Sequence, residues 1–475
     1  MIIKFENFGP IKEFIFDSAY DLNIIFGKNN IGKSYSISAV YLIIKNLINY
    51  QLRYYDEPFL STQNNKEKRR GISDVLVDKI KITDEKTKEI SINKETEEFI
   101  LLLLENSLII NLTQSFINSY SSLENIQNKL SKKQFKLTIT FESAEISIGL
   151  NSKHDRLIVK EVKIWSKIIL KKINSIRNPK SENGNLTFYY NTKTSTITHI
   201  SALINWTLSN MISSIQSEIQ NVYFLPASRS GLYNALNTFS AIIAELSQSR
   251  NFLRTKIEIP NISEPVSDYF LNLSSIKNNS ISNQIENVVA EIENNILKGK
   301  VTFNTKSKKL IYQPEGLKLE LDLSVTSSMI SEIAPIVAHL KFLMNNKVRR
   351  NTYSNSSSSN LIFIEEPEAH LHPEVQVLLI KIFTSLITKK IKIVMTSHSN
   401  YIFNKLNNII LANDIDSKKV SISLMENGKE GSFIKKGAMK LTESGIEDNN
   451  FNKVAEDLYI EREDIYNLKN NDRNS

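Results

Sequence analysis

The first fifty residues alternate between short apolar runs and polar turns, in an order that predicts strand, turn, strand, loop and helix. Asp21–Phe26 is short and mostly apolar, which predicts a buried strand. A glycine-bearing loop follows, and beyond it apolar residues recur at the spacing of one helix face: Ile37, Val40, Tyr41 and Ile44. We therefore expect a strand–loop–helix unit in this part of the chain.

The rest of the chain changes its hydrophobic period several times. Residues 51–133 and 232–298 are mainly helical in pattern, whereas residues 134–200 alternate as strands do. Residues 300–325 predict a β-hairpin. Farther on, strands alternate with helices, and we expect the strands at Leu361–Ile364, Ile391–Thr396 and Ile409–Ala412. Such alternation predicts an α/β fold with a largely parallel sheet.

Composition and charge narrow the class of protein. Of 475 residues, 41% are hydrophobic and 23% are charged, which excludes a largely disordered chain. The absence of cysteine excludes a disulfide scaffold, a cysteine nucleophile and a cysteine-ligated zinc site. The net charge of +8 divides into −5 for residues 443–475 and +13 for the remainder. The larger part of the chain is thus basic enough to suit anionic partners, of which DNA is one.

No part of the sequence predicts a membrane span. The longest apolar run, Phe99–Leu104, is far shorter than the ~20 residues that a transmembrane helix needs. The N-terminus alternates and carries charge, unlike a signal peptide. We therefore expect a cytoplasmic protein without a membrane partner.

The loop after the strand Asp21–Phe26 matches the spacing G-x-x-x-x-G-K-[ST] of a phosphate-binding loop. It consists of Gly27, Lys28, Asn29, Asn30, Ile31, Gly32, Lys33 and Ser34. The glycines let successive backbone N–H groups face a phosphate, and the following helix adds its N-terminal partial charge. Lys33 would bridge the β- and γ-phosphates of ATP, and the Ser34 hydroxyl would ligate Mg²⁺. The alternative is a glycine-bearing turn with a solvated lysine, and the flanking strand and helix favour the phosphate loop.

A second acidic element follows the apolar residues Leu361–Ile364. A buried parallel strand presents the residues at its carboxyl end to a ligand, and here these are Glu365 and Glu366. Glu365 would hold Mg²⁺ through water, and Glu366 would orient or deprotonate an attacking water. The alternative is an ordinary strand that ends in solvated acids. With a phosphate loop in the same chain, we favour the site of a nucleotide hydrolase.

Residues 365–373, EEPEAHLHP, resemble the Walker B and D-loop region of ABC-class ATPase heads. That group includes the SMC, RecF and overcoming-lysogenization-defect proteins, and the sequence is most similar to AAA-type ATPases of prokaryotic defence islands. Residues 393–399 (IVMTSHS) resemble the switch strand of these ATPases, which implies that His398 senses the γ-phosphate and is catalytic with Glu366. Residues 226–231 (PASRSG) resemble an element common in the defence ATPases. Residues 326–332 fall where the ABC signature belongs, which implies that Ser327 and Ser328 contact nucleotide bound to a partner head.

The resemblance implies an α/β fold of the ABC-type P-loop ATPase head, with a mixed or parallel sheet, an antiparallel β subdomain and helical insertions. We divide the chain accordingly into 1–50 (N-terminal lobe of the head with the phosphate loop), 51–133 (helical insertion), 134–231 (β-rich part of the head), 232–299 (helical insertion), 300–442 (C-terminal lobe with signature-like segment, Walker B and switch histidine) and 443–475 (acidic helix and tail).

Two departures from the pattern bear on activity. A glycine usually follows the signature serines, and Met329 stands there instead, which predicts a looser ATP sandwich or slow hydrolysis. Walker B ends here in Glu-Glu rather than Asp-Glu, a difference that a longer side chain can bridge through water. No glutamine can be assigned to a Q-loop. Arg229 has two readings, a contact to phosphate or the interface, or a salt bridge within the head.

Histidines and basic clusters supply further candidates. His370 and His372 have the spacing of a metal pair, but no third ligand is evident, and the resemblance makes them D-loop residues. The basic clusters are Lys66/Lys68/Arg69/Arg70, Lys167/Lys171/Lys172/Arg177 and Lys347/Arg349/Arg350. Such clusters bind nucleic-acid backbones or are simply solvated surface.

The resemblance implies an ATP- and Mg²⁺-dependent ATPase that forms a homodimer or higher homo-oligomer through its heads. It further implies a sensor or regulator in a prokaryotic antiphage defence system of the abortive-infection type. No toprim-like run of acids follows Ala412, so the effector, a nuclease or toxin, is expected to be a separate protein. The alternatives are a RecF- or SMC-like DNA repair or recombination ATPase, and an ATP-binding scaffold with little hydrolysis.

Overall fold

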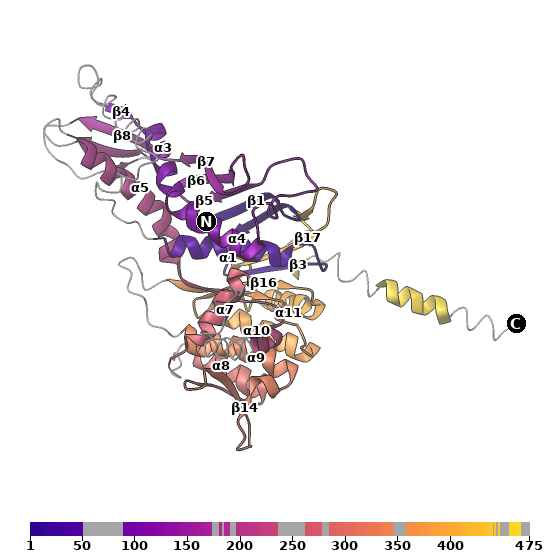
Figure 1. Cartoon of the computed structure of the whole chain (residues 1–475). Coiled ribbons are helices and arrows are strands. Elements are labelled where there is room, and N and C mark those ends of the chain that lie inside the picture. The colour runs from indigo at the N-terminus through magenta and orange to yellow at the C-terminus, as the bar shows by residue number, and fades with distance from the viewer. Residues whose placement is uncertain are drawn as a thin grey trace, which may run out of the picture.

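The computed structural model describes residues 1–50, 89–172, 180–182, 185–190, 196–235, 262–277, 285–344, 358–439, 441–442, 445–446 and 456–466. One sheet of eleven strands runs through the body in the order β11-β15-β16-β3-β17-β18-β2-β1-β5-β6-β7 (Figure 1). Its two halves differ in strand direction.

The first half of this sheet is parallel and holds the predicted strands. Its members are β3 (Leu22–Gly27), β11 (Ile219–Leu225), β15 (Ser359–Glu365), β16 (Ile391–Ser397) and β17 (Val420–Glu426). Every residue of β3 and β16 is buried, as expected for parallel strands covered on both faces. The predicted strands at 361–364 and 391–396 are thereby confirmed.

The second half is antiparallel and forms a β subdomain. It consists of β1 (Ile2–Phe8), β2 (Ile11–Asp17), β5 (Lys136–Thr140), β6 (Ala144–Leu150) and β7 (Leu157–Ile164), and β18 (Ser432–Ile434) joins it to β17. The predicted α/β fold, a mixed sheet with an antiparallel β subdomain, is confirmed.

Two hydrophobic cores cover the two faces of the parallel half. Alternate residues of β15 enter each core, because Leu361 and Phe363 pack on one side and Ile362 and Ile364 on the other. The first core contains α1 (Lys33–Ile48), α3 (Asn93–Glu105), α4 (Leu108–Tyr120) and α5 (Thr196–Glu218). The second contains α7 (Glu264–Ser274), α8 (Glu286–Glu291), α9 (Ser328–Ala338), α10 (Pro373–Ile387) and α11 (Asn400–Leu411).

Three smaller sheets complete the described structure. The predicted hairpin at 300–325 is confirmed, and it belongs to the sheet of β12 (Gly299–Asn304), β13 (Lys309–Pro314) and β14 (Leu321–Asp322). A second sheet consists of β4 (Glu89–Ser91), β8 (Lys167–Lys172), β9 (Lys180–Glu182) and β10 (Asn185–Tyr190). The third pairs β19 (Leu441–Thr442) with β20 (Gly445–Ile446). The six-segment division of the chain stays a prediction.

The predicted strand at 409–412 is wrong. These residues lie at the end of α11, where Ile409 and Ile410 continue a buried helix face begun by Ile402, Phe403 and Leu406. The next strand of the parallel half is β17 instead. A short apolar pair at the end of a helix has no period of its own, so the sequence pattern was ambiguous there.

A helix at residues 456–466 stands apart from the body, and all of its residues are exposed (Figure 1). It overlaps the C-terminal helix that the sequence predicts. In the described part of the chain no single helix is long and apolar enough to cross a membrane. Helices α3 and α4, which meet at a bend, reach that length and apolar character only when they are taken together.

An ionic cluster fastens α7 to α1. Lys45 Nζ lies 2.8 Å from Glu264 Oε1 and 2.5 Å from Asp268 Oδ2. Tyr41 Oη donates to Asp268 Oδ2 at 2.7 Å. Burial lowers the pKa of Lys45, but the bonds to the two carboxylates outweigh it, so the pKa is raised overall. The helix that follows the phosphate loop is therefore fixed to the second core as well as the first.

We expect Lys45→Met to lower the free energy of unfolding by about 2–3 kcal/mol, because it leaves two half-buried carboxylates without their cation. Lys12→Met is the matched control, since the Lys12–Glu430 pair is about half exposed and such pairs contribute about 0–1 kcal/mol. Urea unfolding of both variants measures the difference. Equal small losses in the two would show that the cluster does not stabilise the fold.

Candidate functional site

The predicted phosphate loop spans the gap between β3 and α1. Gly27 has φ +149° and Gly32 has φ +89°, conformations that L side chains rarely adopt. A Cβ atom on Gly27 would also lie 2.6 Å from the Met425 carbonyl oxygen of β17. Both glycines are thus required by the backbone. Ile31 is buried and anchors the loop, while Lys28, Asn29 and Asn30 are exposed. The unpaired N–H groups at the start of α1 make this loop suited to an anion.

Lys33 folds back over the loop that carries it. Its Nζ atom donates to the Gly27 carbonyl at 2.9 Å and to the Lys28 carbonyl at 2.8 Å. Nζ also lies 3.0 Å from Nε2 of His398 on the loop after β16. Burial lowers the pKa of Lys33 to about 8, and the nearby Glu366 and Glu368 offset only part of this effect. The ammonium is held by neutral partners, so a phosphate would be a better partner than those it has.

His398 lies between Lys33 and Glu366. Its Nε2 atom is 3.1 Å from Glu366 Oε1 and also contacts the lysine, so the ring tautomer decides which of the two it bonds. The hydrogen bond from His398 lowers the pKa of Glu366 despite partial burial. The backbone N–H of His398 donates to Glu368 Oε1 at 2.6 Å. The three predicted residues Lys33, Glu366 and His398 therefore form one cluster.

Ser34 and Glu365 form a second pair in the same site. The Glu365 carboxylate accepts from the Ser34 side chain, and its Oε2 accepts from the Ala227 backbone N–H at 3.1 Å. Burial raises the pKa of Glu365, while these two bonds act in the opposite direction. A hydroxyl and a carboxylate side by side are the oxygen ligands that Mg²⁺ takes in proteins, so the pair fits that ion.

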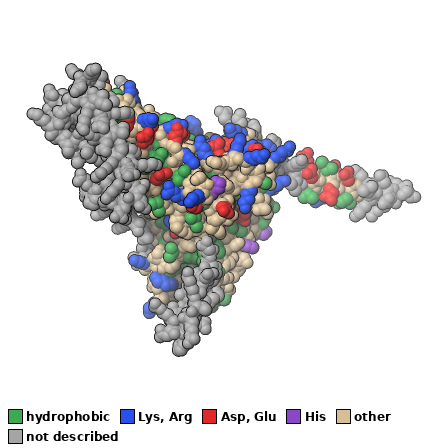
Figure 2. Space-filling model, turned by 45° about the horizontal axis from the view of Figure 1, so that its top comes forward, with side chains coloured by type: hydrophobic (Ala, Val, Ile, Leu, Met, Phe, Trp, Pro, Cys, Tyr) green, Lys and Arg blue, Asp and Glu red, His purple; other side chains and the backbone are tan. Residues whose placement is uncertain are grey.

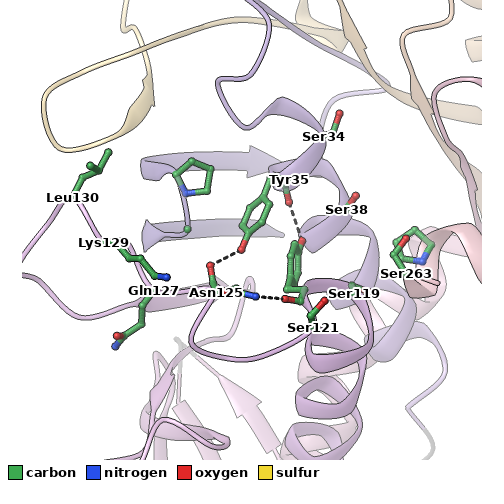
Figure 3. A pocket seen from close by; sticks show the side chains of 14 residues that line it. Ser34, Tyr35, Ser38, Ser119, Ser121, Asn125, Gln127, Lys129, Leu130 and Ser263 are labelled. Carbon is green, nitrogen blue, oxygen red and sulfur yellow. Dashed lines mark hydrogen bonds between the residues drawn. The ribbon is translucent and has the colours of Figure 1, made fainter. Parts of the chain in front are cut away.

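A cavity of about 690 Å³ opens beside Ser34. It is lined by the β1–β2 turn, by α1 and by the segment after α4, with Tyr35, Asn125 and Gln127 on its wall (Figure 3). Tyr35 Oη donates to the Asn125 carbonyl at 2.8 Å, and Tyr120 Oη donates to the Tyr35 carbonyl at 2.9 Å. Sequence reasoning missed this cavity, because its walls come from residues 9–38, 119–130 and 263–265, which carry no shared motif.

A family model described as "AAA ATPase domain" matches residues 1–403 of the 475 residues. The chain belongs to this family. The comparison with curated proteins found no match.

The solved structures that match this ATPase domain include three head domains of SMC proteins. The Smc head bound to the C-winged helix domain of ScpA has 10% identity and a TM-score of 0.36, over 91% of this chain and 96% of that chain. The SMC head domain from Thermotoga maritima has 8% identity and a TM-score of 0.35, over 92% and 97%. An Smc head with an extended coiled coil, bound to the C-terminal domain of ScpA from Pyrococcus furiosus, has 10% identity and a TM-score of 0.38, over 91% and 95%.

Arg229 does not reach the surface of this ATPase domain. Its side chain is fully buried and lies 3.1 Å from Glu332 Oε2, and it donates to carbonyl groups of the same head. The phosphate or interface reading of Arg229 is therefore wrong, and the salt bridge within the head is confirmed. The sequence could not distinguish the two, because burial at this position depends on α9, about a hundred residues farther along.

The signature-like segment begins α9 and lies apart from the phosphate loop. Ser327 caps the helix by accepting from the Ile330 N–H at 3.4 Å, and both Ser327 and Ser328 are exposed. Met329 is half-buried and packs against the second core. No contact among the described residues joins these serines to Lys33, so the structure of one chain leaves their predicted role untested.

The remaining candidates gain no support as a metal site. His370 and His372 are exposed, and within the described ranges no group of three metal-ligating side chains occurs. The basic clusters at 66–70 and 347–350, and Arg177, lie outside the described residues. Lys167 and Lys171 are on β8, and Lys171 pairs with Glu89. Figure 2 shows basic side chains spread along the upper edge of the body.

The lowered pKa of Lys33 predicts a pH-dependent stability. Between the folded pKa of about 8 and the unfolded value of 10.5 the unfolded chain binds more protons, so wild-type stability rises with pH. Lys33→Met lacks this term. The difference in unfolding free energy, wild type minus variant, should rise by up to about 1 kcal/mol per pH unit in that window. Urea titrations at several pH values measure it.

Lys28→Met is the control, because Lys28 is an exposed lysine of the same loop. If Lys33→Met and Lys28→Met followed the same pH dependence, the lysine would not be held in the desolvated position described above.

Proposed function

We propose that this protein is an ABC-class ATPase that binds ATP with Mg²⁺ and hydrolyses the γ-phosphate. The observation that carries the proposal is the convergence of Lys33, His398 and Glu366, where a single histidine nitrogen lies 3.0 Å from the lysine and 3.1 Å from the carboxylate. Lys33 lies 365 residues before His398 in the chain, and the three residues follow three different strands of the sheet. A lysine, a histidine and a carboxylate beside an anion-binding loop form the set needed to hold and hydrolyse a terminal phosphate.

The proposed roles follow from the geometry. Lys33 exchanges its carbonyl partners for the β- and γ-phosphates, which raises its pKa and fixes the ammonium form. With Lys33 so engaged, His398 Nε2 no longer serves the lysine, and its N–H is available to Glu366 and to the γ-phosphate that it senses. Glu366 has a lowered pKa and is therefore ionised at neutral pH, ready to orient or deprotonate the attacking water. Mg²⁺, held by Ser34 and through water by Glu365, would supply charge neutralisation at the phosphates.

The cavity beside Ser34 supports the same substrate. A nucleotide whose phosphates lie on the loop Gly27–Ser34 extends from the start of α1, and the cavity of about 690 Å³ lies there. Its wall has an aromatic side chain at Tyr35 and amide groups at Asn125 and Gln127, which suit a base and a ribose. We assign the nucleoside to this cavity.

We propose that two heads associate around nucleotide, as a homodimer or a higher homo-oligomer. The exposed Ser327 and Ser328 at the N-terminus of α9 provide hydroxyls and helix N–H groups that one chain does not bring to its own phosphate loop. A glycine usually follows the two serines and lets the backbone approach the partner's γ-phosphate, but here Met329 occupies that position. We therefore expect this approach to be less close and hydrolysis to be slow.

The cellular role that we infer is a nucleotide-switched sensor or regulator in a prokaryotic antiphage defence system, acting from the cytoplasm on a separate nuclease or toxin. The support is the resemblance of EEPEAHLHP, PASRSG and the switch strand to defence ATPases. The alternatives are a RecF- or SMC-like repair ATPase, favoured by the basic body with DNA as partner, and an ATP-binding scaffold, favoured by Met329. Neighbouring genes for a nuclease or toxin, as against replication or repair genes, distinguish the first two.

Glu366→Gln tests the enzymatic proposal. The amide cannot accept a proton from water, so steady-state hydrolysis should fall by about 10²–10⁴-fold while ATP affinity stays within about threefold. Phosphate release and equilibrium titration with a fluorescent ATP analogue measure the two quantities. Glu374→Gln, an exposed residue on α10, is the control. Equal background turnover in wild type and Glu366→Gln would leave the scaffold as the correct description.

Nucleotide-dependent association is tested in the same Glu366→Gln background, which retains ATP. With ATP and Mg²⁺ the light-scattering mass should rise to at least twice the 54.3 kDa of the chain. Adding Ser328→Arg should prevent this rise, because it places a large side chain at the contact. Asn210→Arg, on the exposed face of α5, should not. A mass that ignores ATP would contradict association through the heads.

A further inference from the structure

The guanidinium of Arg229 is surrounded by carbonyl oxygens. Nη1 donates to Glu365 at 2.8 Å and to Pro226 at 3.1 Å. Nη2 donates to Glu366 at 3.3 Å, and Nε donates to the Glu332 carbonyl at 3.1 Å. The side chain is fully buried. One planar fork thus binds the end of β11, the end of β15 and helix α9 together.

Glu332 completes the arrangement from α9. It is also fully buried, and its Oε2 accepts from the Arg229 backbone N–H at 3.1 Å. Its Oε1 accepts from the Ser230 N–H at 3.2 Å and from the Ser230 hydroxyl at 2.7 Å. Glu332 therefore pairs with the arginine and also caps the helix that starts at residue 229. Because the buried Arg229–Glu332 pair is held by many hydrogen bonds, its side chains are restricted to one geometry.

The backbone of Glu366 is strained and needs this support. Its φ is +41°, in a region that residues other than glycine rarely adopt. Its N–H donates to Thr396 Oγ1 at 3.3 Å, and its carbonyl accepts from Arg229. The two bonds fix the peptide groups on either side of the Glu366 Cα atom. The direction of the carboxylate toward His398 depends on them.

We propose that Arg229 is a positioning residue for Glu366. Because Arg229 is paired with Glu332 of α9, this positioning depends on the position of α9. The inference rests on the hydrolytic function proposed above. Glu332 lies five residues after Ser327 on the same helix. A displacement of α9 at the partner contact carries Glu332 with it, and through Arg229 shifts the carbonyls of Glu365 and Glu366. Hydrolysis is then fastest when α9 is correctly placed.

The test uses two substitutions in the full chain. Arg229→Lys keeps the charge but cannot bind four carbonyls at once, and Glu332→Gln keeps the shape but removes the charge. The matched control is Glu293→Gln, which breaks another buried ion pair of the same head, Lys341–Glu293, at 2.8 Å. Both glutamates are buried, so the substitutions have comparable costs to stability.

The measurement is the first-order rate constant of a single turnover of bound ATP with enzyme in excess. While folded enzyme remains in excess over ATP and above the dissociation constant, partial loss of folded molecules leaves this rate constant unchanged. Misplacement of the carboxylate lowers the constant itself, by about 10–100-fold for a shift near 1 Å. ATP affinity is titrated in parallel and should change by less than about threefold in all variants.

We expect Arg229→Lys and Glu332→Gln each to lower the constant at least tenfold, with Glu293→Gln within twofold of wild type. The double variant should lose no more than the worse single one, because the two residues act as one unit. Unchanged constants in Arg229→Lys and Glu332→Gln, with wild type active, overturn the positioning role. So does an equal loss in Glu293→Gln. Absence of turnover in wild type contradicts the proposed function itself, and the positioning role falls with it.

Discussion

The alignment of four parallel strand ends is the constraint on which the site depends. Phe26 of β3 pairs with Ser397 of β16, Thr396 pairs with Glu365 of β15, and Ile364 pairs with Leu225 of β11. The residue after each strand therefore emerges at nearly the same level. A shift of one residue in the pairing of β16 with β3 or with β15 would turn side chains to the opposite face of the sheet and separate the lysine, carboxylate and histidine.

The energetics of the site follow from the way that buried polar groups are satisfied there. Lys33 is desolvated and has only carbonyl and imidazole partners, whereas Arg229 is desolvated with a carboxylate and four carbonyls. The first cation can exchange its partners for a ligand. The second already donates to four backbone carbonyls, so it stabilises the frame. Two buried cations near one strand end thus differ in role because their partners differ.

The sequence predicted the local parts of this site from short motifs. The phosphate loop depends on glycines at fixed spacing, and Glu365 and Glu366 follow an apolar run that any parallel strand would show. His398 was implied by the resemblance of residues 393–399 to a switch strand. Their convergence follows from the rule that ligands bind at the carboxyl ends of such strands. The wrong strand at 409–412 and the unassigned role of Arg229 have different causes. The apolar residues at 409–412 are too few to show a period of their own. The burial of Arg229 depends on α9, about a hundred residues farther along the chain.

The two halves of the large sheet are joined through the short strand β18. β18 has three residues, and its pairing with β2 rests on Ser432 with Ile11 and Phe433 with Glu13. Gly431 leads into it, where a Cβ atom would lie 2.6 Å from the Pro10 carbonyl oxygen, so even an alanine would part the two strands. On either side the strands pair over five or six residues. The pairings of β18 with β17 and with β2 are each two residues long, so we expect the amide hydrogens of β18 to exchange faster than those of the longer pairings on either side.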